Sequence, residues 1–177
     1  MTVTYLNNLE QGDFIPNCPF INPYSQISLD DASEEQEIDS DVEMYDVIIL
    51  SQSCDLVRFT DNPRKIKMVL VCPYKPLSQV QLEDEGGFYR SRAGKKALKE
   101  GHVPGYHLLN GCNIEGFELP VIVVDFKNVF SVPIFFIEQY AEKYNLRLRL
   151  CSPYKEHLSQ AFARFFMRVG LPIDIQI

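Results

Sequence analysis

Two runs of consecutive apolar residues in the first half of the chain predict a pair of buried strands. The first, at 44–50, contains Val47-Ile-Ile-Leu50, and the second covers 66–72 and ends before Pro73. An unbroken apolar run of this length is typical of a strand that is buried on both faces. Turn-forming residues at 61–64 separate the two runs, which favours an antiparallel hairpin.

The second half of the chain alternates between the periods of strands and of helices. Strands are predicted at 106–109, at 119–125 with a continuation over 126–130, and at 146–150, and helices at 91–101, 133–145 and 153–169. The last helix carries its apolar residues on one stripe, which predicts that it packs against the strands. That stripe consists of Leu158, Ala161, Phe162, Phe165, Phe166 and Val169. A second copy of the chain is an alternative partner for Phe165 and Phe166, so a homodimer is considered as well.

Two features precede the first buried run. Gly12-Asp13 is a turn that leads into an extended segment, and Pro16 and Pro19 favour an edge position for that segment. Residues 29–43 contain eight Asp or Glu residues. Like charges at this density repel and are solvated, so we expect a mobile acidic insertion there. An arm that docks on a basic partner is the alternative.

Composition limits the class of protein. The 177 residues, 46% of them hydrophobic, suffice for a single domain over residues 1–177 with a sizeable core. No apolar run reaches the roughly 18 residues of a membrane span, and the N-terminus lacks the layout of a secretory signal. A net charge of −7 disfavours nucleic acid as a partner. The five cysteines lack the spacing of a zinc site, so we expect free thiols in a reducing cytoplasm, with no metal and no cofactor.

The first buried run ends in a compact polar cluster, which is the first candidate site. This strand-end cluster consists of Ser51, Gln52, Ser53, Cys54 and Asp55. A cysteine acts as a nucleophile in its thiolate form, which a neighbouring histidine promotes and which a carboxylate helps to orient. Cys54, Asp55 and His157 are therefore a candidate catalytic set, with His107 as an alternative histidine and with the other three residues of the cluster as its lining. The alternative is structural: Cys54 is a small buried apolar residue and Asp55 caps a turn.

A polar ridge on the last predicted helix is the second candidate site. Its members, spaced by three, four and four residues on one helix face, are His157, Gln160, Arg164 and Arg168. Arginine suits planar anions, so we expect Arg164 and Arg168 to bind an anion or to pair with Asp55 or the acidic insertion. A solvated helix face is the alternative. His107, at the head of a predicted strand, is a further binding candidate, for which a structural role is the alternative.

Three segments resemble a widespread family of uncharacterised bacterial proteins. They are Ile49–Leu56, Pro104–Leu109 and Tyr154–Pro172. The resemblance extends over most of the chain from Tyr45 onward and implies no particular activity. Chains of that family are shorter before Tyr45, so the acidic insertion is an elaboration of the shared pattern.

The order of the predicted elements is also similar to that of the MazF/PemK toxin family. The matching features are Gly12-Asp13 before the first strand, the strands that end at Ser51 and Pro73, and the Val121–Val129 segment before a helix. The resemblance implies a small, bent, SH3-like β-barrel and ribonuclease activity. Tyr45-Asp46 stands where those toxins carry a basic residue that takes part in cleavage, followed by a proline.

Together these patterns predict an α+β protein with a small, mostly antiparallel β-barrel and two or three helices, the last packed on the barrel. They favour a binding module with a protein partner, and the barrel resemblance suggests a bacterial toxin–antitoxin or phage-defence setting. A hydrolase, either a MazF-like endoribonuclease or a Cys54-dependent enzyme, is the alternative.

Overall fold

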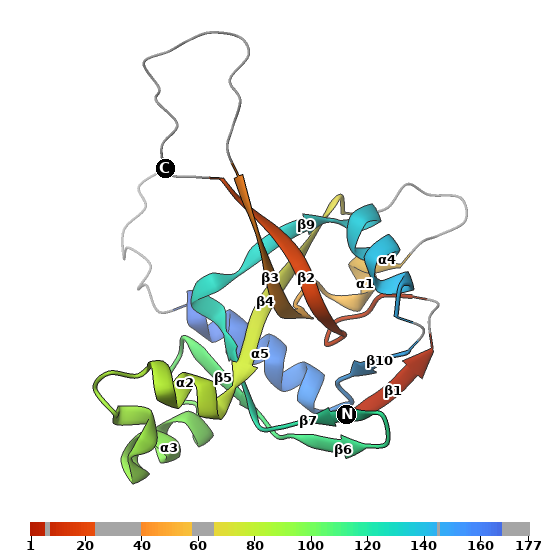
Figure 1. Ribbon diagram of the computed structural model, residues 1–177. Coiled ribbons are helices and arrows are strands. Elements are labelled where there is room, and N and C mark those ends of the chain that lie inside the picture. The colour runs from red at the N-terminus through yellow and green to blue at the C-terminus, as the bar shows by residue number, and fades with distance from the viewer. Residues whose placement is uncertain (6–7, 24–39, 58–65, 145, 168–177) are drawn as a thin grey trace, which may run out of the picture.

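The computed structural model describes residues 1–5, 8–23, 40–57, 66–144 and 146–167, and all structural statements concern these residues (Figure 1). The strands are β1 (Thr2–Tyr5), β2 (Phe14–Pro23), β3 (Ser40–Ile49), β4 (Met68–Pro76), β5 (Tyr106–Leu109), β6 (Cys112–Ile114), β7 (Phe117–Leu119), β8 (Ile122–Asp125), β9 (Phe130–Pro133) and β10 (Leu146–Arg149). The α-helices are α1 (Ser53–Leu56), α2 (Leu77–Glu83), α3 (Arg92–Lys99), α4 (Ile134–Glu142) and α5 (Tyr154–Phe166), with 3-10 turns η1 (Phe88–Arg90) and η2 (Phe126–Asn128). The predicted α+β class is confirmed.

An antiparallel six-stranded sheet forms the centre of the fold. Its strand order is β2-β3-β4-β8-β5, and β9 pairs with another part of β4. Two smaller sheets pair β1 with β10 and β6 with β7. The predicted antiparallel pairing is confirmed, but β2 and β5 are the ends of the order, so the described sheet does not close into the predicted β-barrel. The number of helices is also wrong, since five α-helices are present among the described residues instead of two or three.

The predicted pairing of the two apolar runs is confirmed. β3 and β4 are antiparallel, with Val47 opposite Pro73. Both strands are longer than predicted, because β3 begins at Ser40 and β4 continues through Pro73 to Pro76. Residues 40–43 of the expected acidic insertion are therefore strand residues paired with β2. The rest of that insertion, 29–39, lies outside the described residues.

Alternate residues of β3 point into two different cores, one on each face of the sheet. Ile49 joins the core that contains Leu56 of α1 and Ile137 of α4. Ile48 joins the core that contains Leu158 of α5. Because successive strand residues point to opposite faces, α1 and α5 lie on opposite sides of the sheet.

The chain bulges between β8 and β9, where it forms η2. Val71 pairs with Phe130 and Tyr74 pairs with Val124, so two residues of β4 (72–73) oppose five residues of the other chain segment (125–129). The Cys72 thiol donates to the Asp125 carbonyl at 3.0 Å, which helps to fix the bulge. Bulges redirect side chains. Here the bulge buries the ring of Phe126 on the α5 side and leaves Lys127 and Asn128 exposed.

The Gly12-Asp13 turn joins the central sheet to the end of β10. Gly12 N–H donates to the Ile49 carbonyl, and the Gly12 carbonyl accepts from Leu150 N–H, both at 2.9 Å. Gly12 has a φ of +83°, and a Cβ atom there would lie 2.9 Å from Leu150 Cβ, so glycine is required. Asp13 is fully buried and accepts hydrogen bonds from both Arg147 and Arg149.

The predicted packing of the last helix against the strands is confirmed. Leu158 is fully buried, and Ala161, Phe162 and Phe165 pack against the same core. Phe166 departs from the predicted stripe because its side chain is exposed, and Val169 lies outside the described residues. Among the helices that the structure describes, none has both the length and the apolar character needed to cross a bilayer.

Candidate functional site

The serines of the strand-end cluster hold the ends of neighbouring chain segments together. Ser51 Oγ accepts from Leu70 N–H at 2.8 Å, and Ser53 Oγ accepts from Gln11 N–H at 3.2 Å. The buried Gln11 side chain donates its Nε2–H to the Leu50 carbonyl at 2.8 Å. Hydroxyl groups that satisfy backbone donors in this way stabilise local structure. The structure therefore gives both serines an anchoring role at the junction of β3, β4 and the Gly12-Asp13 turn.

Cys54 is exposed, so the alternative in which it is a buried apolar residue is wrong. Its Sγ lies 3.7 Å from Gln52 Oε1 and 3.8 Å from Asp55 Oδ1. Leu56 anchors this short helix, α1, in the core beneath α4, on the face of the sheet opposite α5. His157 of α5 is consequently on the other side of the sheet, and the structure does not assemble the expected set of Cys54, Asp55 and His157.

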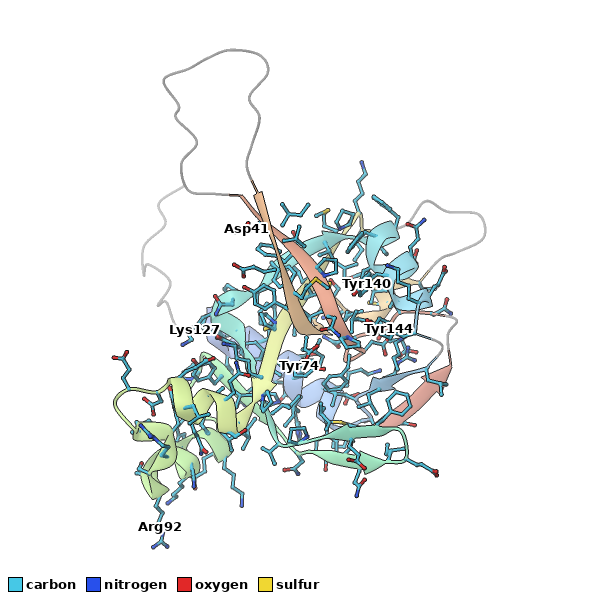
Figure 2. The ribbon with its side chains drawn as sticks, viewed as in Figure 1. Asp41, Tyr74, Arg92, Lys127, Tyr140 and Tyr144 are labelled. Atoms are coloured by element: carbon cyan, nitrogen blue, oxygen red, sulfur yellow. The ribbon has the colours of Figure 1, made fainter. Side chains whose placement is uncertain are left out.

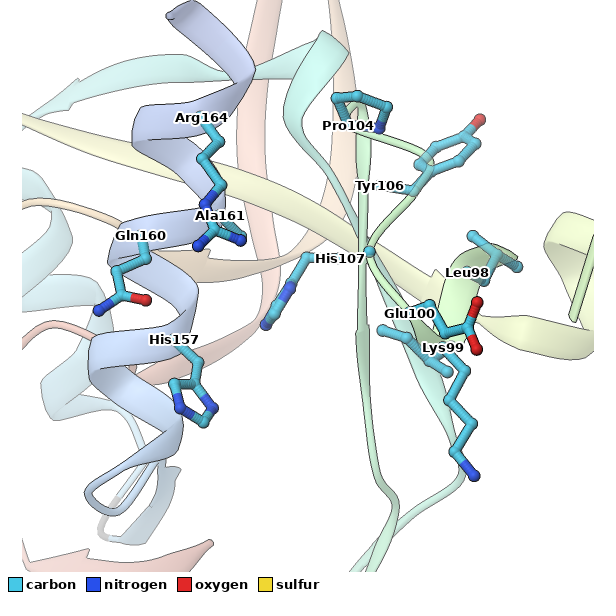
Figure 3. Close-up of a pocket in the computed structure, with 12 residues that line it drawn as sticks. Leu98, Lys99, Glu100, Pro104, Tyr106, His107, His157, Gln160, Ala161 and Arg164 are labelled. Carbon is cyan, nitrogen blue, oxygen red and sulfur yellow. The ribbon is translucent and has the colours of Figure 1, made fainter. Parts of the chain in front are cut away.

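The predicted ridge of α5 instead faces His107 of β5 across a cavity of about 410 Å³, which we call the α5–β5 cavity (Figure 3). Its polar lining consists of His157, Gln160 and Arg164 from α5, Tyr106 and His107 from β5, and Lys99 and Glu100 at the end of α3. The Arg164 side chain and the two imidazole rings extend into the same space in Figure 3. The structure thus brings together three predicted binding residues, His107, Gln160 and Arg164, with His157 of the expected catalytic set, and Arg168 lies outside the described residues.

Core packing fixes the two walls of the α5–β5 cavity. The Phe126 ring, directed inward by the bulge, is stacked with His107 at a centroid distance of 6.1 Å and an angle of 15°. The same ring contacts Phe162 of α5 at 5.4 Å between centroids. Leu158 follows His157 directly and is fully buried, which fixes the rotation of α5 about its axis. Both walls are therefore regular elements held by one shared aromatic contact, as a preorganised site requires.

The charges that line the α5–β5 cavity favour an anion. Arg164 and Lys99 are exposed cations, and Glu100 is the acidic residue of the lining, 3.8 Å from Lys96. Burial and then the neighbouring His157 lower the pKa of His107 to about 4, so its ring is neutral at pH 7. A neutral imidazole offers one donor and one acceptor. The cavity therefore combines positive charge with an uncharged hydrogen-bonding ring.

The wall that α3 contributes was missed by reasoning from the sequence. The helix itself was predicted, and Ser91 Oγ caps it by accepting from Gly94 N–H at 3.0 Å. Gly101, with a φ of +70°, follows the helix end, and residues 102–105 alone lead to β5. This short connection is the signal that places Lys99 and Glu100 beside the head of β5.

Comparisons of the chain with protein-family models, with curated proteins and with solved structures find no match in any of the three. The resemblances to the uncharacterised bacterial family and to the MazF/PemK toxins stay predictions. What the fold and the site define is an α+β protein with an open, cation-bearing cavity between a sheet strand and its last described helix.

Proposed function

We propose that the protein is a binding module whose α5–β5 cavity receives an anionic group of its ligand. The observation that carries the proposal is the convergence of Arg164, His157 and Lys99 on one cavity, in a chain whose net charge is −7. A guanidinium group donates two parallel N–H bonds to a carboxylate or a phosphate, and its positive charge shortens and strengthens those bonds. Arg164 is accordingly the principal contact, with His157 and Lys99 beside it.

His107 and the apolar part of the lining would provide selectivity. A neutral His107 ring adds a hydrogen bond at pH 7 without adding charge. Leu98, Leu108 and Ala161 complete the cavity with apolar surface. A few convergent polar groups over an apolar wall suit the recognition of a small molecule or of one terminal group of a larger partner.

A protein is the source of the anionic group that we favour, in keeping with the expectation from the sequence. The bacterial toxin–antitoxin or phage-defence setting stays a prediction, as does MazF-like endoribonuclease activity. The Cys54-dependent hydrolase retains one supporting observation, the exposed thiol 3.8 Å from Asp55 Oδ1. Neither His157 nor His107 is its partner, because Leu158 of α5 and the Phe126 ring that stacks with His107 belong to the core on the other face of the sheet.

The proposal is tested with inorganic phosphate as the probe. Phosphate is titrated into 15N-labelled protein at pH 7, and the shifts of the backbone amide signals give the Kd. We expect the shifts to concentrate at residues 98–108 and 157–164. Arg164→Gln should weaken binding about tenfold or more, because a hydrogen bond to a charged group contributes about 1.5–3 kcal/mol.

Arg92→Gln is the matched control for this titration. It removes the same charge from an exposed side chain that projects outward from α3 (Figure 2). The Kd of this variant should equal that of the unmodified protein. An equal loss of affinity in the two variants would mean that net charge alone attracts phosphate, and the proposed site would then be wrong.

A further inference from the structure

A second cavity, of about 350 Å³, lies over β4 beside the β8–β9 bulge. We call it the aromatic cavity because Phe20, Tyr45 and Phe130 contribute three rings to its lining. Lys75, Asp125, Lys127 and Asn128 supply its polar groups. These lining residues differ from those of the α5–β5 cavity, and the two cavities meet where Lys127 contacts Tyr106.

The aromatic cavity exists because β3 separates from β4. Their ladder ends at the pair of Val47 and Pro73, beyond which the paired strands β2 and β3 diverge from β4 (Figure 1). The rings of Phe20 on β2 and Tyr45 on β3 lie near the ring of Phe130 at the start of β9. The ring centroids are 4.5 Å apart for Phe20 and Phe130, and 6.1 Å apart for Tyr45 and Phe130. The three half-buried rings form one apolar wall.

The bulge supplies three of the polar residues of the same cavity, Asp125, Lys127 and Asn128. Asp125 Oδ1 accepts from Lys127 N–H at 3.1 Å, and Asp125 Oδ2 accepts from Asn128 Nδ2 at 2.8 Å. These two bonds hold the turn and orient the Asn128 amide. Lys127 Nζ donates to Tyr106 Oη at 2.9 Å, and this bond raises the pKa of Lys127, so the ammonium group stays charged. Lys75 is held by Glu83 at 2.9 Å.

We propose that the aromatic cavity binds a nucleotide, with the base against the Phe20–Tyr45–Phe130 wall and the phosphate near Lys127. Every nucleobase has a flat π-face that can stack on an aromatic ring, so this contact does not depend on which base is present. The amide of Asn128 has both donor and acceptor capacity, which suits the edge of a base. A lysine ammonium group binds phosphate as a point charge. An apolar ligand would leave these oriented polar groups of the bulge without a function in binding.

Adenosine 5′-monophosphate is the probe, with ribose 5-phosphate as the probe that lacks the base. All titrations use the Arg164→Gln background, so that phosphate binding in the α5–β5 cavity contributes less to the measured affinities. The nucleotide should bind about tenfold more tightly than ribose 5-phosphate, because stacking requires the base. Equal affinities for the two probes, or no binding of the nucleotide at 10 mM, would overturn the proposal.

Substitutions then locate the binding. Phe130→Leu should weaken nucleotide binding about tenfold through lost stacking, and Lys127→Gln should weaken both probes by about the same factor. Phe88→Leu, in a ring that is exposed outside the cavity, should change neither affinity. If Phe130→Leu does not fold, the exposed Asn128→Ala variant decides, since it should weaken the nucleotide and leave ribose 5-phosphate unchanged. Unchanged nucleotide affinity in the folded cavity variants would contradict the assignment.

A 5′-phosphorylated oligoadenylate distinguishes a free nucleotide from the end of a single-stranded nucleic acid as the ligand. Binding more than tenfold tighter than that of the mononucleotide identifies the end of a single-stranded nucleic acid as the ligand. Equal binding identifies a free nucleotide. Both modes of binding use the same wall of rings, so Phe130→Leu should weaken the oligonucleotide and the mononucleotide by about the same factor.

Discussion

The strand-end cluster and the α5–β5 cavity are both rich in polar residues, yet the structure uses them differently. In the strand-end cluster, Ser51 and Ser53 accept hydrogen bonds from backbone N–H groups of two other segments. In the α5–β5 cavity, Arg164 and the two imidazole rings extend into an open space (Figure 3). The cluster that is most compact in the sequence is therefore a junction, and the residues that converge on a cavity come from distant elements.

The difference follows from where each polar group finds its partner. A polar residue just after a buried strand lies next to backbone groups that need hydrogen bonds, and it satisfies them. A polar residue beside the apolar stripe of an amphipathic helix faces the side chains of the neighbouring strand. For α5 that neighbour is His107, which the shared Phe126 contact fixes in place.

The largest effect is expected at the buried ion pairs of the junction. Asp13→Asn should lower the free energy of unfolding by about 3–5 kcal/mol, because it leaves the buried Arg147 without its charged partner at 2.8 Å. Urea unfolding measures this loss. Glu10→Gln is the control, since its carboxylate is partly exposed and its loss should cost about 1 kcal/mol or less. If Asp13→Asn lowered the free energy of unfolding no more than Glu10→Gln does, the buried ion pairs would not stabilise the junction.

The next effect concerns pH and belongs to the α5–β5 cavity. The folded-state pKa of His107 is about 4, against an ordinary value of 6.5, so between these values the unfolded chain takes up a proton that the folded protein excludes. The contribution of His107 to the free energy of unfolding is therefore complete above pH 6.5. It decreases by about 2–3 kcal/mol as the pH falls toward 4. His107→Gln should flatten that part of the profile, and His102→Gln, at an exposed position, should not. Identical slopes in the two variants would show that another group is responsible.

A smaller loss of stability should follow from the junction residue Gln11. Gln11→Ala removes the donor to the Leu50 carbonyl and should cost about 1–3 kcal/mol, since a buried acceptor loses its partner. The exposed Gln52→Ala is the control and should stay within about 0.5 kcal/mol of the unmodified protein. Thermal unfolding of both variants measures the two losses. A loss of stability in Gln52→Ala as large as in Gln11→Ala would contradict the specific role of Gln11 at the junction.

The smallest effect is expected at Cys54. Cys54→Ala should change the free energy of unfolding by no more than about 0.5 kcal/mol, because the side chain is exposed. The Kd for phosphate should also be unchanged. Loss of phosphate binding in a folded Cys54→Ala protein would mean that Cys54 affects the α5–β5 cavity across the sheet, and it would contradict the separate roles of the junction and the cavity.

The elements with a strong period were predictable from the sequence. The unbroken apolar run at Val47–Leu50 predicts a strand buried on both faces, as β3 is. The apolar stripe on α5 predicts the side of the helix that packs on the core. The open sheet was not predictable, because element order does not specify which edge strands meet. Nor was the bulge at 125–129, which depends on the change of partner along β4.

The candidate site was predictable in part for the same reason. Helical spacing placed His157, Gln160 and Arg164 on one face, and the structure keeps them together. The direction in which α1 leaves the strand depends on the burial of Leu56 beneath α4, a contact between distant segments. No local pattern encodes that contact, so the sequence does not show that Cys54 and His157 lie on opposite faces of the sheet.

The most direct test of the proposed anion site observes its histidines. The chain has three histidines, so the imidazole C–H signals in a 1H–13C spectrum are few and can be assigned by substitution. On addition of inorganic phosphate at pH 7, the signals of His107 and His157 should shift in the unmodified protein and should shift much less in Arg164→Gln at the same phosphate concentration. Unmoved signals in the unmodified protein, or equal shifts in both proteins, would contradict anion binding in the α5–β5 cavity.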